Sequence, residues 1–558
     1  MFGAGGGTSS YAEIEETDVV LLWGSNARET HPIFFHHLLK GVHNGARLVV
    51  IDPRRTTSAQ WADRWLGLEV GSDIALSNTM AREIIHAGFA NEAFISHATV
   101  GYEAYAASVE PFTLEEGERL TGVPAEAIRE TAHAFARADR AMICWTLGIT
   151  EHHTAVDNVL SLINLALLCG HVGRFGSGLN PLRGQNNVQG GGDMGAIPNK
   201  LPGFQDIERD PAARERFEAA WQTTIRPQDG WNLTEMFEGM EHGELRTLYV
   251  IGENPAQSEA DINRTRKLLA GLDFLVVQDI VLTKTAEMAD VVFPSAASWC
   301  ETDGTVTNSE RRVQRVRKAL DPPGEARDDM WIITELARRL GQAWDDPVAE
   351  TVWDELRSLS PMHGGMSYAR LEEHGGLQWP CPDESHPGSP MLHERLWAEP
   401  LEGAPAPFSV VEARGPFEEL DADYPIRLTT GRRLESYNTG AQTNLYSSPL
   451  HRGESLDLSP EDAERMELAD GEIVKVSSRR GSVEAPVRID LSLRPGLAFM
   501  TFHFPDQVDT NQLTIDATDP KSGTAEFKAA AIRVDKLGPA EHGQRAGIAE
   551  PATVGGRA

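Results

Sequence analysis

The sequence predicts an α/β protein with Rossmann-like, doubly wound domains and a carboxyl-terminal β-barrel domain. Three observations predict this fold class. Apolar strands alternate with helical patterns in the first half of the chain, and the same βαβ pattern returns much later. After residue 424, short strands rich in Val, Ile, Thr and Phe are separated by glycine turns. A chain of 558 residues also has room for about three or four domains.

The first βαβ unit lies near the start of the chain. "DVVLLWGSN" (18–26) reads as a strand that runs into a polar turn. "THPIFFHHLLKGVHNG" (30–45) suits a helix that ends at glycine, and "ARLVVIDPR" (46–54) suits the next strand. Together they predict one unit of a parallel sheet.

A second unit repeats this layout in "LRTLYVIGENP" (245–255) and "DFLVVQDI" (273–280). Gly24 and Asp52 are 28 residues apart, and Gly252 and Asp279 are 27 apart. Ligands of doubly wound sheets bind beyond the carboxyl ends of the strands, where a helix amino terminus receives phosphate. The duplication therefore predicts two nucleotide-like groups. The alternative is that two unrelated βαβ units share a Gly-x-Asn turn and a terminal Asp by chance.

The remaining chain divides by composition. We predict an α/β domain over 1–185, a second and partly discontinuous α/β domain over 186–390, and a linker over 391–423. The whole stretch 361–425, rich in Pro, Gly, Glu and His, reads as loop. We predict a β-barrel over 424–535 and a disordered tail over 536–558.

The segment "PLRGQNNVQGGGDMG" (181–195) has hardly an apolar side chain and predicts a loop. Its formal G-x-G-x-x-G (Gly190, Gly192, Gly195) follows a polar stretch, not a strand, which disfavours a nicotinamide-dependent dehydrogenase. An arginine on such a loop, Arg183, can bind a small carboxylate through two charge-assisted hydrogen bonds. A solvated loop arginine is the plain alternative.

Composition excludes several function classes. A net charge of −32 argues against a nucleic-acid surface, and no apolar run reaches the roughly 20 residues that a membrane helix needs. "VLSLINLALLCG" (159–170) reads as a buried helix. The four cysteines have no C-x-x-C spacing, so we expect buried thiols and no metal site built from this chain's residues. The pairs His36-His37 and His152-His153 are interpreted as structural.

Taken together, these stretches resemble the molybdopterin-dependent oxidoreductase family, specifically its formate dehydrogenase alpha subunits. The resemblance runs through "DVVLLWGSNARETHP", "VIDPRRTTSAQWAD", "LALLCGHVGRFGSGLNPLRGQNNVQGGGDMGA", "VIGENP", "VQDIVLTKTAEMADVVFPSA" and "LTTGR…YNTGAQT". It covers almost the whole chain to about residue 535, and it implies the architecture of that family without its amino-terminal part.

The resemblance also implies a cofactor and the residues that bind it. The cofactor is a bis-molybdopterin guanine dinucleotide carrying molybdenum or tungsten. The first guanine dinucleotide is expected at Asn26, Asp52, Arg54, Gly71, Ser72 and Asp73. The second is expected at Gly252, Asn254, Gln278, Asp279, Thr283 and Asp290. Thr430, Gly431, Arg432, Gln442, Thr443 and Asn511 belong to the barrel side, Gly184 and Gln185 lie near the pterins, and Arg183 holds formate.

The implied reaction is the oxidation of formate to carbon dioxide, with two electrons passing to the metal. The implied partners are electron-transfer subunits or carriers: NAD-linked, ferredoxin or a hydrogenase. Nitrate reductases share the family fold and are one alternative. A non-catalytic cofactor-binding subunit is another. The visible sequence predicts a cytoplasmic protein without direct membrane insertion, although an export signal could precede it.

The sequence departs from the family at its start. The four cysteines of the family's four-iron four-sulfur cluster, the cysteine or selenocysteine that binds the metal, and a neighbouring histidine are all missing before "MFGAGGGTSS". We expect no catalysis from the chain alone, and the cluster only if the missing segment is supplied. Either the gene encodes a short, split subunit, or the reading frame begins upstream and a selenocysteine codon was read as stop. The second is favoured, and exposed apolar surface is expected around the second βαβ unit.

Overall fold

The first lobe is built on a parallel five-stranded sheet of order β3-β2-β1-β5-β6. The computed structural model describes residues 5–441 and 452–537. The strands are β1 (Val19–Trp23), β2 (Arg47–Ile51), β3 (Arg64–Leu66), β5 (Ala141–Trp145) and β6 (Gly178–Pro181). β1 pairs in parallel with both β2 and β5. The strand order therefore reverses beside β1, which is where doubly wound sheets bind ligands.

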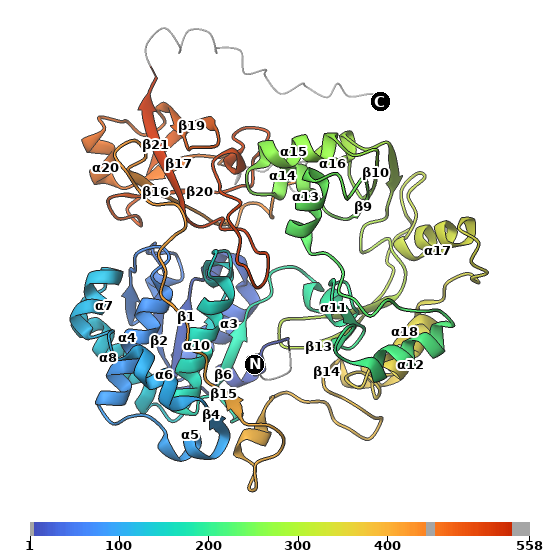
Figure 1. Cartoon of the computed structure of the whole chain (residues 1–558), viewed down its shortest axis with the longest axis horizontal. Helices are drawn as coiled ribbons and strands as arrows, with labels where there is room; N and C mark the ends of the chain where they lie inside the picture. The colour runs from blue at the N-terminus through green and yellow to red at the C-terminus, as the bar shows by residue number, and fades with distance from the viewer. Residues whose placement is uncertain (1–4, 442–451, 538–558) are drawn as a thin grey trace.

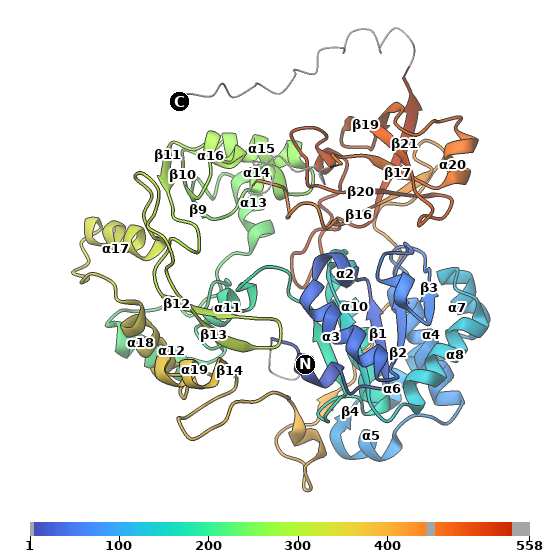
Figure 2. The ribbon, with the colours of Figure 1, turned by 180° about the vertical axis from the view of Figure 1, so that it is seen from behind.

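Helices cover both faces of this sheet (Figures 1 and 2). Leu21 and Trp23 of β1 pack into a core with α4, α8 and α10, while Val20 and Leu22 pack against α3 on the other side. Because both faces are covered, every residue of β1 is buried. The buried helix expected at 159–170 is confirmed within α10. The helices of this lobe are α1 (Tyr11–Ile14), α2 (Ala27–Thr30), α3 (Pro32–His43), α4 (Asp73–His86), α5 (Glu92–Ala98), α6 (Tyr102–Val109), α7 (Leu114–Thr121), α8 (Ala125–Arg137), α9 (Leu147–Thr150) and α10 (Ala155–Cys169), with the 3₁₀ turn η1 (Ala59–Trp61).

The second βαβ unit forms a separate parallel sheet of order β11-β10-β9, drawn in green in Figure 1. Its strands are β9 (Thr247–Ile251), β10 (Phe274–Asp279) and β11 (Val291–Pro294), and its helices are α13 (Leu233–Glu241), α14 (Pro255–Ser258), α15 (Ile262–Ala270) and α16 (Lys284–Glu287). Val250, Leu275 and Val277 form the core of this unit. On the opposite face Ile251 and Phe274 are 43% and 42% exposed.

Residues 186–390 also hold a second, antiparallel sheet of order β12-β13-β14. Its strands are β12 (Gly304–Thr307), β13 (Arg312–Val316) and β14 (Leu377–Gln378). This part also contains the two-stranded sheet of β7 (Lys200–Leu201) and β8 (Gln205–Asp206), and the helices α11 (Val188–Asp193), α12 (Pro211–Trp221), α17 (Asp329–Arg339), α18 (Ala349–Leu359) and α19 (Tyr368–His374). The loop interpretation of 361–425 is wrong at α19. Ser367 caps that helix by accepting a hydrogen bond from the Arg370 backbone, and only Tyr368 and Leu371 are buried in it. Two apolar residues are too few to mark a helix in the sequence.

The carboxyl-terminal domain is the expected barrel. Its strands close in the order β16-β20-β17-β19-β18-β21 around a core that includes Leu428, Val474 and Val487. The strands are β16 (Ile426–Thr430), β17 (Leu456–Leu458), β18 (Ile473–Ser477), β19 (Ser482–Ile489), β20 (Leu497–Met500) and β21 (Ala530–Lys536), with α20 (Pro460–Arg465) and η3 (Thr510–Gln512). β21 continues to Lys536, and residues 538–558 of the predicted tail lie outside the described residues.

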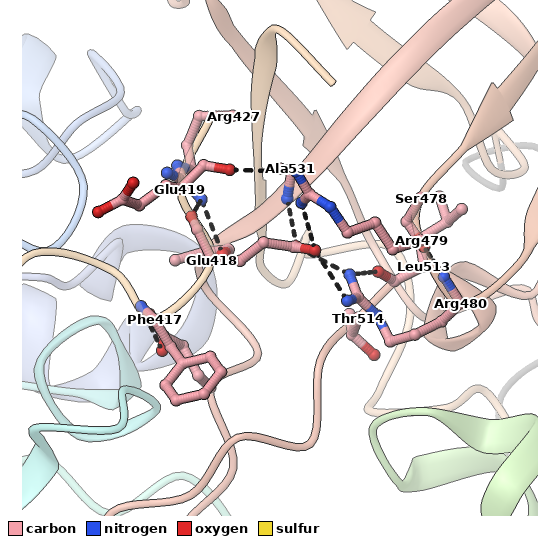
Figure 3. A network of polar contacts seen from close by, with 12 residues as sticks. Phe417, Glu418, Glu419, Arg427, Ser478, Arg479, Arg480, Leu513, Thr514 and Ala531 are labelled. Carbon is pink, nitrogen blue, oxygen red and sulfur yellow. Dashed lines mark hydrogen bonds and ion pairs between the residues drawn. The ribbon is translucent and has the colours of Figure 1, made fainter. Parts of the chain in front are cut away.

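Residues 391–423 run along the first lobe toward the barrel (Figure 1). β15 (Ala406–Pro407) of this segment pairs in parallel with β4 (Thr99–Val100), and η2 (Glu394–Trp397) precedes it. At the barrel the segment is held by Glu418 (Figure 3). The Glu418 carboxylate accepts hydrogen bonds from Arg479 (2.7 Å), Arg480 (2.9 Å) and the backbone N–H of Ala531 (2.7 Å).

Removing this carboxylate should destabilise the barrel. Glu418 is only 6% exposed, so a Glu418→Ala variant leaves the Ala531 N–H without its acceptor and leaves Arg480 only the Leu513 carbonyl oxygen. We expect the free energy of unfolding to fall by about 3 kcal/mol, as for other buried ion pairs that lose one partner, measured by urea denaturation. Glu412→Ala is the control, because Glu412 pairs with Arg414 in the same segment but both side chains are exposed. Equal denaturation curves for the two variants would remove Glu418 from this role.

The fold also buries titratable groups, and His363 is 0% exposed. Burial lowers the pKa of His363 to about 4 from its ordinary 6.5. Its Nδ1 lies 2.7 Å from Ser360 Oγ, and among residues 5–441 and 452–537 its Nε2 has no hydrogen-bond partner.

This histidine should make the protein acid-labile. Between pH 6.5 and 4 the unfolded chain binds a proton that the folded chain does not, so stability present above pH 6.5 is lost as the pH falls. A shift of this size corresponds to as much as about 3 kcal/mol. We expect His363→Gln to flatten the pH dependence of the thermal midpoint in that window. A midpoint that falls just as steeply in the variant would show that other groups account for the acid lability.

The cysteines and the apolar helices can also be compared with the sequence. All four cysteines (Cys144, Cys169, Cys300 and Cys381) are free and buried, as expected. Across residues 5–441 and 452–537 no helix has the length and apolarity to cross a membrane.

Candidate cofactor and substrate site

The two βαβ units repeat each other in their turns. Gly24 follows β1 with a φ of 56° and Gly252 follows β9 with a φ of 65°, values that favour glycine. Asn26 and Asn254 then precede the short helices α2 and α14. The Asn26 side-chain oxygen accepts a hydrogen bond from the Ser58 N–H, 32 residues later, and the Asn254 oxygen accepts one from the Thr285 N–H, 31 residues later, both at 3.2 Å.

The acids that end the next strands also correspond. The Arg54 N–H donates to Asp52 Oδ1 at 2.9 Å, and the Ile280 N–H donates to Asp279 Oδ1 at 2.7 Å. Burial raises the pKa of both carboxyl groups, against the opposing effect of Arg54 at Asp52. Each acid therefore accepts a hydrogen bond from the backbone of its own turn, and each also lines a cavity.

Two cavities lie against these turns. The first, of about 490 Å³, is bounded by the carboxyl ends of β1, β2, β5 and β6 and by the barrel residues after β16. The second, of about 510 Å³, is bounded by the turns after β9 and β10 and by barrel loops. Among the described residues, those that line both cavities are Gln185, Arg432, Tyr437 and Asn438. The two half-sites therefore meet at Gln185, two residues after Arg183.

Most of the residues expected at the site line these cavities. Asn26, Asp52, Arg54, Gly71, Asp73, Arg183, Gly184, Thr430 and Gly431 line the first. Gly252, Asn254, Asp279 and Thr283 line the second, and Gln185 and Arg432 line both.

Four expected residues lie outside both cavity walls. Ser72 precedes α4, where its hydroxyl donates to Glu69 O. Gln278 is buried and donates to Asp329. Asp290 accepts from the Leu275 N–H. Asn511 is buried and joins the barrel to α14 by donating to Gln257 O. Gln442 and Thr443 lie outside the described residues.

The residues of the two cavities fit a phosphate-containing dinucleotide cofactor. A Cβ added at Gly184 or Gly252 would meet no protein atom within 4 Å, so both backbones lie open to a ligand. In the first cavity wall, Arg433 Nη1 is buried without a hydrogen-bond partner in the described part of the chain. Arg54 stacks 3.7 Å above the Phe499 ring, which holds its charge beside Asp52. Open glycine backbone, arginine side chains and carboxylates at the strand ends suit a pyrophosphate and a purine base.

The segment 181–195 is partly helical, which corrects the loop expectation. α11 (Val188–Asp193) begins after Asn187, whose φ is 63°. Gln189 and Asp193 of this helix are buried, at 2% and 0% exposure, and they are held by hydrogen bonds to other side chains. Buried polar side chains with complete hydrogen bonding replace the apolar anchor that the sequence lacks.

Arg183 itself is held at its backbone and along one edge. Its carbonyl accepts from His31 Nε2 at 3.0 Å and from Ser309 Oγ at 3.1 Å. Its Nε donates to Gln189 Oε1 at 2.9 Å and its Nη2 to Gly5 O at 2.8 Å. Nη1 has no hydrogen-bond partner within residues 5–441 and 452–537. One end of the guanidinium is thus available for an anion.

Sequence reasoning missed several cavity residues. Lys528 lies in the first cavity wall, donates to Thr430 O at 3.1 Å and pairs with Glu151 at 2.7 Å. Burial lowers its pKa. His152, read as structural, also lines this cavity while its Nε2 donates to Gly148 O. Lys528 sits in no motif, and the adjacent pair His152-His153 gives no sign of a cavity, so only the folded chain reveals these positions. Among the described residues no cluster of His, Cys, Asp and Glu could hold a metal ion.

Comparison with known proteins agrees with this geometry. The family model "Molybdopterin oxidoreductase" matches residues 4–339, and "Molydopterin dinucleotide binding domain" matches residues 426–531. The chain is 43% identical to F420-dependent formate dehydrogenase 2 subunit alpha of Methanococcus maripaludis, covering 96% of this chain and 79% of the relative. It is 36% identical to formate dehydrogenase H of Escherichia coli, covering 96% and 75%.

A more distant relative and a solved structure complete the comparison. The assimilatory nitrate reductase catalytic subunit of Bacillus subtilis is 33% identical, covering 96% of this chain and 76% of the relative. Acetylene hydratase from Pelobacter acetylenicus superposes with a TM-score of 0.69 at 20% identity, covering 95% of this chain and 79% of that one, which supports the fold. With two family models matched in order over the two parts of the chain that build the cavities, this protein belongs to the molybdopterin oxidoreductase family.

Proposed function

We propose that this protein is the catalytic subunit of a formate dehydrogenase, which oxidises formate to carbon dioxide and passes on two electrons. The observation that carries the proposal is Arg183, which lies in the wall of the first cavity, two residues before Gln185, which lines both cavities. Within residues 5–441 and 452–537 its Nη1 makes no hydrogen bond. The similarity to formate dehydrogenase alpha subunits over 96% of the chain supports it.

The cofactor we propose is a bis-molybdopterin guanine dinucleotide with molybdenum or tungsten. Two cavities with repeated Gly-x-Asn turns and terminal acids support two guanine dinucleotides. Asp52 and Asp279 would accept hydrogen bonds from the bases, while Arg54, Arg432 and Arg433 would bind phosphate or pterin oxygens. When bound, this group supplies the two-electron redox chemistry. A four-iron four-sulfur cluster belongs to the proposal only with a segment that supplies its cysteines.

This chain's own contribution is binding and orientation. Arg183 would hold the formate carboxylate through Nη1 and the second Nη2 hydrogen, neutralise its charge and aim its C–H bond into the cavity. His31 and Ser309 donate hydrogen bonds to the Arg183 carbonyl oxygen, which fixes the position of the backbone that carries the guanidinium. Burial lowers the pKa of His31, which favours the neutral ring that donates to the Arg183 carbonyl oxygen.

The proposed partners are formate and an electron-transfer subunit or carrier, either NAD-linked, ferredoxin or a hydrogenase. The names of the relatives as subunits support assembly with further chains. A cytoplasmic location is part of the same proposal and is tested by cell fractionation.

The decisive assay compares substrates on the enzyme purified from its native cells with any associated subunits. We expect formate to reduce an artificial dye, and metal analysis to find molybdenum or tungsten. Nitrate reduction without formate oxidation would favour the alternative indicated by the nitrate reductase relative. A complex without either metal would favour a non-catalytic cofactor-binding subunit.

A further inference from the structure

We propose that Gln189 and Asp193 are positioning residues for Arg183, which hold its guanidinium by one edge while leaving its charge to the substrate. This inference rests on the proposed function, because it concerns the arginine assigned to formate. Both residues lie on α11, the helix that begins five residues after Arg183.

The contacts form a buried chain that starts at the guanidinium. Arg183 Nε donates to Gln189 Oε1 at 2.9 Å, and Gln189 Nε2 donates to Asp193 Oδ1 at 2.8 Å. Asp193 Oδ2 then accepts from Trp379 Nε1 at 2.7 Å. Gln189, Asp193 and Trp379 are 2%, 0% and 1% exposed, so water does not compete for these hydrogen bonds. The partners of Gln189 fix its amide with the oxygen toward Arg183.

The amide between the arginine and the acid matters electrostatically. A carboxylate placed directly on Arg183 would neutralise the guanidinium and weaken its attraction for a second anion. Gln189 instead offers a neutral acceptor and keeps the Asp193 charge one side chain away. Burial raises the pKa of Asp193 to about 6, so the group is mostly ionised at neutral pH. Its charge then favours the protonated Arg183 and Arg311 near it.

The surroundings make this arrangement rigid. Arg183 Nη2 and Gln189 Nε2 both donate to the Gly5 carbonyl, at 2.8 and 3.2 Å. The next residue, Gly6, lies so close that a Cβ there would approach Arg311 Cγ to 2.9 Å and Trp379 Cη2 to 3.0 Å. Arg311 is 0% exposed and donates to Gly7 O at 2.6 Å. The Nε–Nη2 edge of Arg183 therefore faces fixed acceptors. Arg183 lines the first cavity, and within residues 5–441 and 452–537 its Nη1 makes no hydrogen bond.

The test is Gln189→Glu in the cofactor-loaded enzyme, with Gln205→Glu as the matched control. Gln205 is also a buried glutamine whose oxygen accepts from an arginine, Arg216, and whose nitrogen donates to carbonyl oxygens, but it lines neither cavity. We expect Gln189→Glu to raise the KM for formate at least tenfold while kcat changes less than threefold. The dissociation constant of azide, a small linear monoanion, should rise in parallel by calorimetry. Gln205→Glu should alter neither constant.

A second variant keeps the inference testable if Gln189→Glu fails to fold. Asp193→Asn preserves the shape but offers Gln189 and Trp379 one acceptor fewer, and we expect a smaller rise in KM, of roughly three- to tenfold. Wild-type constants in both folded variants would overturn the positioning role. If Arg183→Lys also leaves the formate KM unchanged, the proposed function fails; if only Arg183→Lys raises it, the proposed function stands and this inference falls.

Discussion

We expect Arg183→Lys to raise the KM for formate by roughly 10- to 100-fold, with a smaller change in kcat. Two charge-assisted hydrogen bonds to a carboxylate contribute about 1.5–3 kcal/mol each. An ammonium group keeps the charge but loses the planar fork. In this structure Arg183 Nε also donates to Gln189 and Nη2 to Gly5. The single nitrogen of a lysine cannot make both hydrogen bonds while it binds a substrate. Steady-state kinetics with formate measures the effect.

Arg214→Lys is the control for this substitution. Arg214 is also partly buried and donates to a backbone carbonyl, Ile207 O, at 2.7 Å, but it lies in neither cavity wall. Its variant should keep the wild-type KM. Unchanged Michaelis behaviour in Arg183→Lys of a complete enzyme would remove Arg183 from substrate binding. An equal rise in both variants would point to a general disturbance of the fold.

The architecture of the two half-sites was predictable because it depends on local patterns. Each half-site has four features that can be recognised in the sequence at a fixed spacing. These are a buried parallel strand, a positive-φ glycine, an asparagine before a helix and an acid at the end of the next strand. The structure places Gly24 and Gly252, and Asp52 and Asp279, in equivalent turns. The short strands between glycine turns likewise predict a barrel, and the structure confirms it.

The surroundings of Arg183 were not predictable, because they come from distant parts of the chain. Gly5, Ser309 and Trp379 lie between 126 and 186 residues from the partners they contact on segment 181–195. No spacing rule links such positions. The sequence pattern does not predict the helix α11, for a related reason. Its buried face is polar, with Gln189 and Asp193 in place of leucines, so hydrophobic periodicity cannot detect it.

Filling the second half-site should remove the cofactor from the purified enzyme. Gly252 lies in the wall of the second cavity, where an added Cβ would enter open space. A leucine there would project into the volume that we assign to a guanine dinucleotide. We expect Gly252→Leu to lose most of its guanine nucleotide and metal, quantified per chain after acid release and by elemental analysis.

Backbone strain alone must be separated from cavity filling, and Gly243→Leu does so. Gly243 has a φ of 73°, close to the 65° of Gly252, and its Cβ would also meet nothing within 4 Å. It follows α13 at the surface, away from both cavities. Both substitutions therefore carry a similar cost of about 1–2 kcal/mol for a left-handed residue, but only Gly252→Leu occupies the site. Full cofactor content in folded Gly252→Leu would mean that the second cavity holds no part of the cofactor. Equal loss in both variants would mean that strain, not occupancy, releases it.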